Sequence, residues 1–176
     1  MPRTVPTAAT VSPGTYATAA LWNANVQYAS SFLTGPPVFS GYQTTAQSIP
    51  NGVFTSFTID TEVLDPDGGH STVTNTSRYT ATVPGVYLII ATAGWAANST
   101  GYRRLRITLN GAAIPGAAVG ADATNAVLCG QSIATLVVMN GSTDFIEAQG
   151  AQSSGGALAA YNQDFAPSLR VFWISR

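Results

Sequence analysis

Charge is scarce in this sequence: lysine is absent, and charged residues make up 9% of the 176 residues, against about a quarter in an average soluble domain. The formal net charge is −1, so no bulk field attracts nucleic acid or an anionic membrane, and we expect neither as a partner. The single cysteine, Cys129, excludes an internal disulfide. No apolar run is long enough to cross a bilayer, and the start Met-Pro-Arg shows no secretory leader, so we expect synthesis in a cytoplasm and no membrane insertion.

Histidine is almost absent as well. His70, beside a Gly-Gly turn, is the only one, and no lysine can replace it as the base that nucleophilic triads need. We therefore expect His70 to be a solvated loop residue in a protein with no enzymatic activity and no cofactor. One acidic cluster offers oxygen ligands of the kind that Ca²⁺ takes, but its spacing lacks a full calcium-loop pattern and includes an Asp-Pro-Asp-Gly turn. The sequence thus predicts no metal site, with four carboxylates as weak candidates: Asp60, Glu62, Asp65 and Asp67.

What the sequence does have is a long apolar strand, residues 84–96, which begins at the Pro84-Gly85 turn. Both of its alternations are apolar: Val86, Leu88 and Ile90 point one way, and Tyr87, Ile89, Ala91, Ala93 and Trp95 the other. Because a half-exposed strand alternates apolar with polar residues, we expect the domain's own core to cover one face and another copy of the chain to cover the other. The alternative is a central strand of a single-chain sandwich. The predicted interface between copies consists of Tyr87, Ile89, Trp95 and Trp173.

From Val38 onward the signals are strands and turns, with no intervening helix. Strands are expected over residues 53–63, 79–83, 103–109 and 145–149, with a second two-faced run over 127–139 and a terminal strand over 169–174. Turns are expected at residues 65–69 and at Asn110-Gly111. Strands at this spacing predict an all-β fold, an antiparallel sandwich with jelly-roll topology.

Two segments precede the strands. Residues 1–16 show no periodicity and predict either an extended arm that becomes ordered on a partner or a floppy terminus. Residues 17–33 predict the only helix, capped by Thr18 and ended by Gly35-Pro36-Pro37. We therefore divide the chain into an attachment segment, residues 1–35, and a head domain, residues 36–176.

Two neighbouring stripes give the predicted helix one broad apolar face. One stripe consists of Trp22, Val26, Ala29 and Leu33, and the other of Leu21, Asn25, Tyr28 and Phe32. Since a helix of this length is marginal alone, we expect it to pack with parallel copies, with Asn25 on the seam fixing the register, or else on its own domain. The residues predicted to form the attachment and trimerisation helix are Leu21, Trp22, Asn25, Val26, Tyr28 and Phe32.

The order of these signals over residues 36–176 resembles the globular head of complement component one-q, which shares the tumour-necrosis-factor jelly roll. The matching features are Val38-Phe39-Ser40, Tyr79 ahead of Pro84-Gly85-Val86-Tyr87, the basic strand 103–109 with Asn110-Gly111, Asn140-Gly141 ahead of Phe145, and the aromatic strand Val171-Phe172-Trp173. The resemblance implies a homotrimer that closes around a threefold axis.

The leader is similar to the opening of small virion proteins of actinobacterial tailed phages, which often read Thr-Ala-x-x-Leu-Asn, a short helix and Pro-Pro before a β domain. Here the match runs from Thr18 to Val26, with Trp22 as an extra residue before Asn23, and continues with Phe32-Leu33 and Pro36-Pro37. This resemblance implies a virion structural protein made in the host cytoplasm. It would be a homotrimeric head-decoration or minor tail protein, anchored on capsid or tail proteins by its N-terminal segment.

The alternative function is a receptor- or carbohydrate-binding head of a tail fibre or spike that recognises a host-surface glycan. Loops at the end of a sandwich are suited to this work, and exposed aromatic side chains there can form a sugar platform. Tyr102 and Tyr161, beside Gly101 and Asn162, are the possible glycan-binding residues.

Overall fold

The computed structural model describes residues 3–123 and 129–176. One helical segment precedes the strands, made of α1 (Ala19–Trp22), the π-helical turn η1 (Asn23–Gln27) and α2 (Tyr28–Thr34). Thr18 caps it as predicted, because its Oγ1 accepts a hydrogen bond from the Leu21 backbone N–H at 3.2 Å. The helix ends at Gly35, ahead of Pro36-Pro37, so the predicted helix is confirmed.

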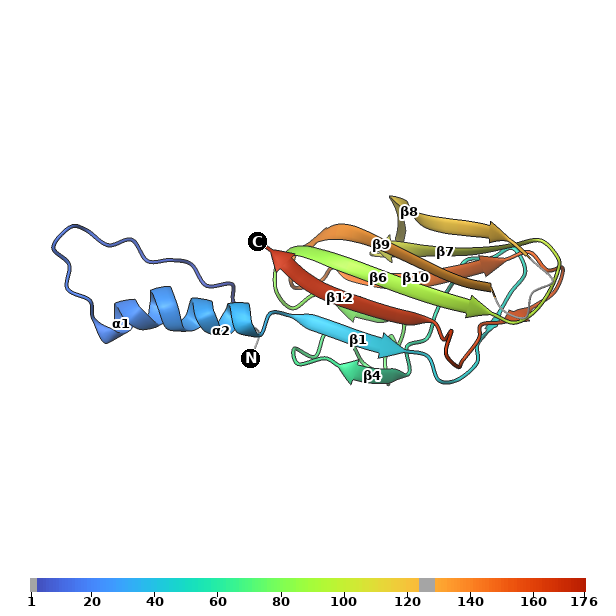
Figure 1. Ribbon diagram of the computed structural model, residues 1–176, viewed down its shortest axis with the longest axis horizontal. Coiled ribbons are helices and arrows are strands. Elements are labelled where there is room, and N and C mark those ends of the chain that lie inside the picture. The colour runs from blue at the N-terminus through green and yellow to red at the C-terminus, as the bar shows by residue number, and fades with distance from the viewer. Residues whose placement is uncertain (1–2, 124–128) are drawn as a thin grey trace.

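Two antiparallel sheets face each other beyond the helix (Figure 1). The first has the order β4-β1-β12-β6-β9, with β1 (Val38–Tyr42), β4 (Thr61–Leu64), β6 (Gly85–Trp95), β9 (Cys129–Met139) and β12 (Ser168–Ser175). The second has the order β3-β10-β7-β8, with β3 (Thr55–Ser56), β7 (Tyr102–Leu109), β8 (Ala112–Asp122) and β10 (Phe145–Gln152), and β5 (Arg78–Thr80) also pairs with β10. A small third sheet joins β2 (Ser48–Ile49) to β11 (Leu158–Ala159).

The chain passes repeatedly from one sheet to the other. It crosses between β6 and β7, between β8 and β9, and between β9 and β10. This is the topology of a jelly roll, so the predicted all-β fold with one N-terminal helix is confirmed. The two-faced run predicted over 127–139 is β9 from Cys129 onward, while residues 127 and 128 lie outside the described residues. Strand β8 was not predicted.

The helix and the arm extend from one end of the sandwich, the end at which β12 finishes (Figure 1). The arm runs back alongside the helix and contains one turn, in which the Thr15 backbone N–H donates to the Ser12 carbonyl oxygen at 3.1 Å. In this single chain the predicted extended arm therefore lies on its own helix. Among the described residues, no helix is both long enough and apolar enough to span a membrane.

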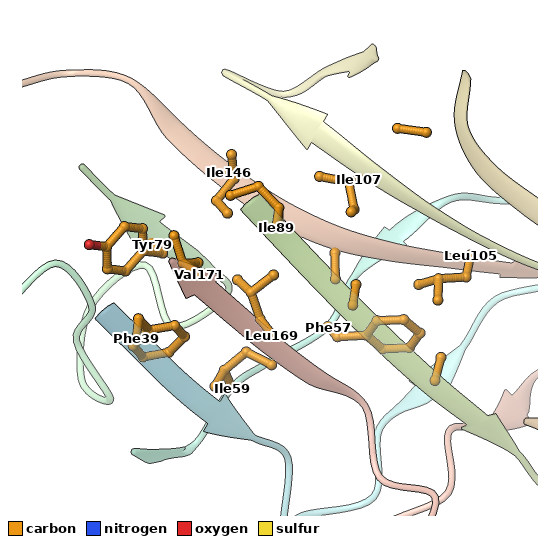
Figure 2. Close-up of a cluster of buried hydrophobic side chains, with 14 of the residues drawn as sticks. Phe39, Phe57, Ile59, Tyr79, Ile89, Leu105, Ile107, Ile146, Leu169 and Val171 are labelled. Atoms are coloured by element: carbon orange, nitrogen blue, oxygen red, sulfur yellow. The ribbon is translucent and has the colours of Figure 1, made fainter. Parts of the chain in front are cut away.

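The core fills the space between the two sheets. Figure 2 shows Phe39, Ile89, Leu169 and Val171 of the first sheet meeting Leu105, Ile107 and Ile146 of the second, with Tyr79, Phe57 and Ile59 beside them. Only two residues connect β7 to β8: Asn110, with φ of 52°, and Gly111, with φ of 79°. This confirms the predicted tight turn.

The inward face of β6 is the one that was predicted to meet another copy. Tyr87, Ile89 and Trp95 have no exposed surface and lie in the core, so no neighbouring chain can reach them. Trp173 packs instead at the junction with the helix, where its ring meets that of Phe32 edge-on with centroids 4.8 Å apart. The predicted interface is therefore wrong. Periodicity divides a strand into two faces, but it does not say which face turns inward.

His70 is not the solvated loop residue expected from the sequence. Its side chain is buried, and the ring nitrogens Nδ1 and Nε2 lie 2.7 Å from the Arg78 carbonyl oxygen and 2.9 Å from the Ile59 carbonyl oxygen. The ring also packs against that of Phe39, with centroids 5.0 Å apart. The His70 ring thus bridges two parts of the chain at the edge of the core: the segment that precedes β4, and strand β5.

Candidate assembly surfaces

The outer face of the first sheet is apolar at the end near the helix. Leu88 on β6 lies opposite Leu136 on β9 and Phe172 on β12, and Phe172 lies opposite Val38 on β1. Directly opposed residues share a face, so these four side chains form one row across the sheet. Val86 on β6 and Val138 on β9 form the next pair toward the helix. We call this surface the apolar face, made of Val38, Val86, Leu88, Leu136, Val138 and Phe172.

The apolar face is open to solvent in the single chain. Leu136 is 62% exposed and Val138 is 72% exposed. Single exposed apolar side chains are ordinary, but a contiguous row of them on a sheet face marks an interaction surface. This surface was not predicted from the sequence, because the larger, aromatic alternation of β6 was assigned to the interface between copies and Val86 and Leu88 were assigned to the core.

Farther from the helix the same face becomes polar. The next row consists of Ser40, Arg170, Ile90 and Ala134, and the row after it of Tyr42, Ser168, Thr92 and Ser132. The apolar surface is therefore confined to the end of the sandwich that carries the helix.

The predicted helix stripe that contains Asn25 and Phe32 contacts other parts of the same chain. Phe32 is buried against Trp173, and the Asn25 Oδ1 accepts a hydrogen bond from the Ala9 backbone N–H at 2.6 Å. The Asn25 Nδ2 donates to the Leu21 carbonyl oxygen at 3.1 Å. Asn25 therefore faces the arm, and the prediction that it lies on a seam between copies is wrong, because both ends of its amide already have partners.

The other stripe is mostly exposed, although Trp22 and Val26 border a hollow that residues 11–17 of the arm also line. Trp22 is 61% exposed and Leu33 is 70% exposed, and Val26 between them is also exposed. We call Trp22, Val26, Ala29 and Leu33 the helix seam. Their 4-3-4 spacing is that of the contact positions of a coiled coil, so the helix seam can pack against parallel copies of itself. Of the other predicted attachment residues, Leu21 is half-buried and Tyr28 is exposed beside the arm.

Arg3 fixes the start of the arm. Its guanidinium makes two hydrogen bonds of 2.7 Å to the Asp67 carboxylate and a third to the Gly35 carbonyl oxygen. Asp67 belongs to the predicted turn over 65–69, so this ion pair ties the arm to the loop between β4 and β5. A groove of about 850 Å³ remains between residues 3–7 and the helix, so the arm lies on the helix without closing over it.

The four candidate metal ligands do not gather at one site. Asp60, Asp65 and Asp67 each bind a different segment: residues 44–45, residues 69–70 and Arg3. Glu62 is exposed on β4. Among the residues that the structure describes, no three side chains of the types that bind metal ions lie together.

Asp60 holds the loop that follows β1. Its Oδ1 accepts hydrogen bonds from the Thr44 backbone N–H at 2.6 Å and the Thr44 hydroxyl at 2.7 Å, and its Oδ2 accepts one from the Thr45 backbone N–H at 2.9 Å. Partial burial raises the pKa of this carboxyl, but the hydrogen bonds outweigh burial and lower the pKa to about 2. The carboxylate thus acts as the anchor of a turn.

The two possible glycan-binding tyrosines lie near the end of the sandwich opposite the helix, but in different places. Tyr102 begins β7, and the guanidinium of Arg104 lies 4.2 Å from the centre of its ring. Tyr161 follows β11 and packs against Phe165, with ring centroids 6.5 Å apart. Tyr102 lines a small groove with Arg104 and Asp122, and Tyr161 is not part of it, so in the part of the chain that the structure describes the two tyrosines do not form one platform.

Solved structures of several kinds share this sandwich. The globular domain of zebrafish complement 1qA aligns with a TM-score of 0.58 at 16% identity, over 80% of this chain and 98% of that one. Murine APRIL aligns with a TM-score of 0.59 at 11% identity, over 78% and 98% of the two chains. PRD1 vertex protein P5 aligns with a TM-score of 0.57 at 19% identity, over 79% and 97%.

At these identities the comparisons show the fold: the chain has the jelly roll of complement one-q and tumour-necrosis-factor-like proteins. Neither a protein-family model nor a curated protein sequence matches the chain.

Proposed function

We propose that this chain is a non-enzymatic structural protein of a virion, a homotrimeric head-decoration or minor tail protein held by its N-terminal segment. The observation that carries the proposal is the presence of two uncovered apolar surfaces at the same end of the molecule, the apolar face and the helix seam. A lone chain leaves both in water, at a cost of about 25 cal/mol for each Å² of apolar surface.

A threefold axis can cover both surfaces at once. The helix leads directly into β1, which borders β12, and the Trp173 backbone N–H donates to the Pro37 carbonyl oxygen at 3.0 Å. The helix seam and the apolar face are therefore connected through an ordered junction, which favours one continuous interface. The resemblance to complement one-q domains, which form trimers, supports three copies.

Placement in a virion rests on two likenesses. PRD1 vertex protein P5, from a phage, has the same fold, and the leader is similar to those of small phage virion proteins. On this proposal the attachment segment, residues 1–35, binds capsid or tail proteins of the same particle. The protein is made in the host cytoplasm and carried in the virion.

The oligomeric state tests the proposal. Sedimentation equilibrium of the full chain at micromolar concentration should give three times the 18.1 kDa mass of one chain. The double substitution Leu136→Ser and Val138→Ser should shift the mass to that of a single chain without loss of fold, because both side chains are exposed in the monomer. Val73→Ser, at an exposed position away from both surfaces, is the matched control and should remain a trimer. A wild-type protein that sediments as a stable monomer would refute the trimer.

A second experiment tests the attachment segment. Particles assembled with a chain that lacks residues 3–35 should lose the head domain, while the full chain is retained. Retention of the truncated chain at full occupancy would show that the head domain, and not the leader, holds the protein on the virion.

A second candidate function is recognition of a carbohydrate on the host surface. One observation favours it, a groove lined by polar and aromatic side chains toward the end of the sandwich opposite the helix.

A further inference from the structure

A loop that folds over the first sheet forms this groove. Residues 161–167 connect β11 to β12 and lie on the outer face of β6 and β9, beyond the polar rows of that face. The resulting groove measures about 450 Å³, within the usual size range of small-ligand sites. Its lining comes from β1, β6, β9, β12 and the loop: Tyr42, Thr92, Ser132, Asp164, Phe165 and Arg170 among them.

Two directly paired glycines make room for the loop. Gly94 on β6 lies opposite Gly130 on β9, and Phe165 rests on both. A methyl group at Gly94 would collide with the Phe165 backbone, and one at Gly130 would lie 3.1 Å from the Phe165 ring. The Tyr161 backbone N–H donates to the Gly94 carbonyl oxygen at 2.8 Å, so the loop is fixed where it enters the face.

Tyr161 supports the groove wall without lining the groove. Its hydroxyl donates to the Gln163 Oε1 at 3.0 Å, and its ring packs against that of Phe165. This residue was predicted to touch a glycan, and the structure places it one layer behind the residues that line the groove.

The lining offers three kinds of contact. Tyr42 and Phe165 expose part of their rings, which provide apolar faces. Asp164 and Arg170 both line the groove, yet they form no salt bridge among the described residues, and the Arg170 Nη1 donates only to the Ser168 hydroxyl at 3.0 Å. A free carboxylate therefore accepts hydrogen bonds and a free guanidinium donates them from two separate walls.

We propose that this groove binds a neutral saccharide, with sugar hydroxyls donating to Asp164 and accepting from Arg170 while a sugar C–H face packs against an aromatic ring. The single negative and single positive charge of the lining favour a neutral ligand, since a charged one would meet a like charge. This inference rests on the second candidate function and assigns it a site.

A smaller groove is the rival site. Tyr102, Arg104 and Asp122 line a hollow of about 230 Å³ near the same end of the sandwich. Its residue types are similar, but the Arg104 guanidinium already covers the Tyr102 ring. The aromatic face that a sugar needs is therefore taken, which favours the groove beside Phe165.

The test uses the full chain on an array of immobilised neutral and acidic oligosaccharides, followed by calorimetric titration with the strongest neutral ligand. Asp164→Asn and Arg170→Ala should each lower affinity by tenfold or more. The matched controls Asp122→Asn and Arg104→Ala, both in the smaller groove, should change it less than twofold. Sedimentation of each variant checks that fold and assembly are intact.

The possible results distinguish failure of the proposed groove from failure of carbohydrate recognition as a function. Carbohydrate binding that survives Asp164→Asn and Arg170→Ala but disappears with the control substitutions overturns the groove and leaves carbohydrate recognition standing. Binding restricted to acidic oligosaccharides overturns the neutral ligand class. An array with no retained oligosaccharide overturns both the groove and the second candidate function.

Discussion

At the scale of single residues, two core tyrosines differ in whether the hydroxyl has a partner. The Tyr87 hydroxyl donates to the Val83 carbonyl oxygen at 2.5 Å, whereas that of Tyr79 is buried with no partner among the described residues. Burial raises the pKa of both phenols, that of Tyr87 to about 12. Both hydroxyls are therefore neutral donors at physiological pH, one of them unused.

We predict that removal of the two hydroxyls changes the free energy of unfolding differently. Tyr87→Phe should lower the free energy of unfolding by about 1 kcal/mol, because the Val83 carbonyl oxygen loses its donor inside the core. Tyr79→Phe should leave the free energy of unfolding unchanged or raise it, because it removes a buried group that has no partner. Urea unfolding of the two variants measures the difference, and equal losses would contradict these assignments.

Asp60 makes stability depend on acid pH. Its pKa in the folded chain, about 2, lies below the ordinary value of 3.8, so its contribution is fully present above pH 4 and is lost as the pH falls through about 2. Asp60→Asn should be less stable than the wild type at pH 7, and the gap should narrow steadily as the pH falls from about 4 to about 2. Thermal unfolding across this range is the measurement, and a gap that stays constant with pH would exclude the carboxylate as its cause.

At the scale of elements, one apolar stripe of the helix packs within the chain and the other is exposed to solvent. Phe32 and Asn25 hold the helix to Trp173 and to the arm. The helix seam is left over, and a helix of this length gains most of its stability from packing. On the proposed trimer, the helix is therefore a connector whose exposed side packs against other copies.

We predict that the helix seam can be weakened without harm to the head domain. Trp22→Ser with Leu33→Ser should raise the concentration at which the trimer dissociates by tenfold or more, since both side chains are exposed in one chain. Gln27→Ser, at an exposed helix position outside both stripes, should leave dissociation unchanged. Sedimentation velocity over a dilution series compares the three proteins, and equal dissociation in all of them would remove the helix from the interface.

At the scale of the whole molecule, one end is suited to assembly and the opposite end to contact with a ligand. The apolar rows, the helix and the arm lie together, while the polar rows and the groove lie at the far end. An anchored trimer would hide the first end and present the second. Stability should then belong to the assembly more than to the single chain.

Thermal unfolding should accordingly depend on protein concentration. Because association stabilises only the folded state, a tenfold rise in concentration should raise Tm by about 2–4 °C. The Leu136→Ser and Val138→Ser variant should show a Tm that is independent of concentration. A wild-type Tm that does not move over a hundredfold range would mean that folding and assembly are separate.

Some features resisted prediction because their signals are weak or non-local. Strand β8 contains Pro115 and Gly116 among small residues, so it shows no alternation, and it forms only by pairing with β7 at the edge of the sheet. The groove combines residues from Tyr42 to Arg170, which no spacing along the chain brings together. Gly94 and Gly130 were visible in the sequence, but their pairing was not.

By itself, the sequence determined what depends on neighbours along the chain: the Thr18-capped helix, the Asn110-Gly111 turn and the apolar character of both alternations of β6. Only the tertiary structure decided which apolar face became core. The aromatic face turned inward, where Tyr87 and Trp95 also find hydrogen-bond partners in Val83 and Gln131. Periodicity distinguishes two sides of a strand, but the space between two sheets and the buried polar partners within it exist only after the chain has folded.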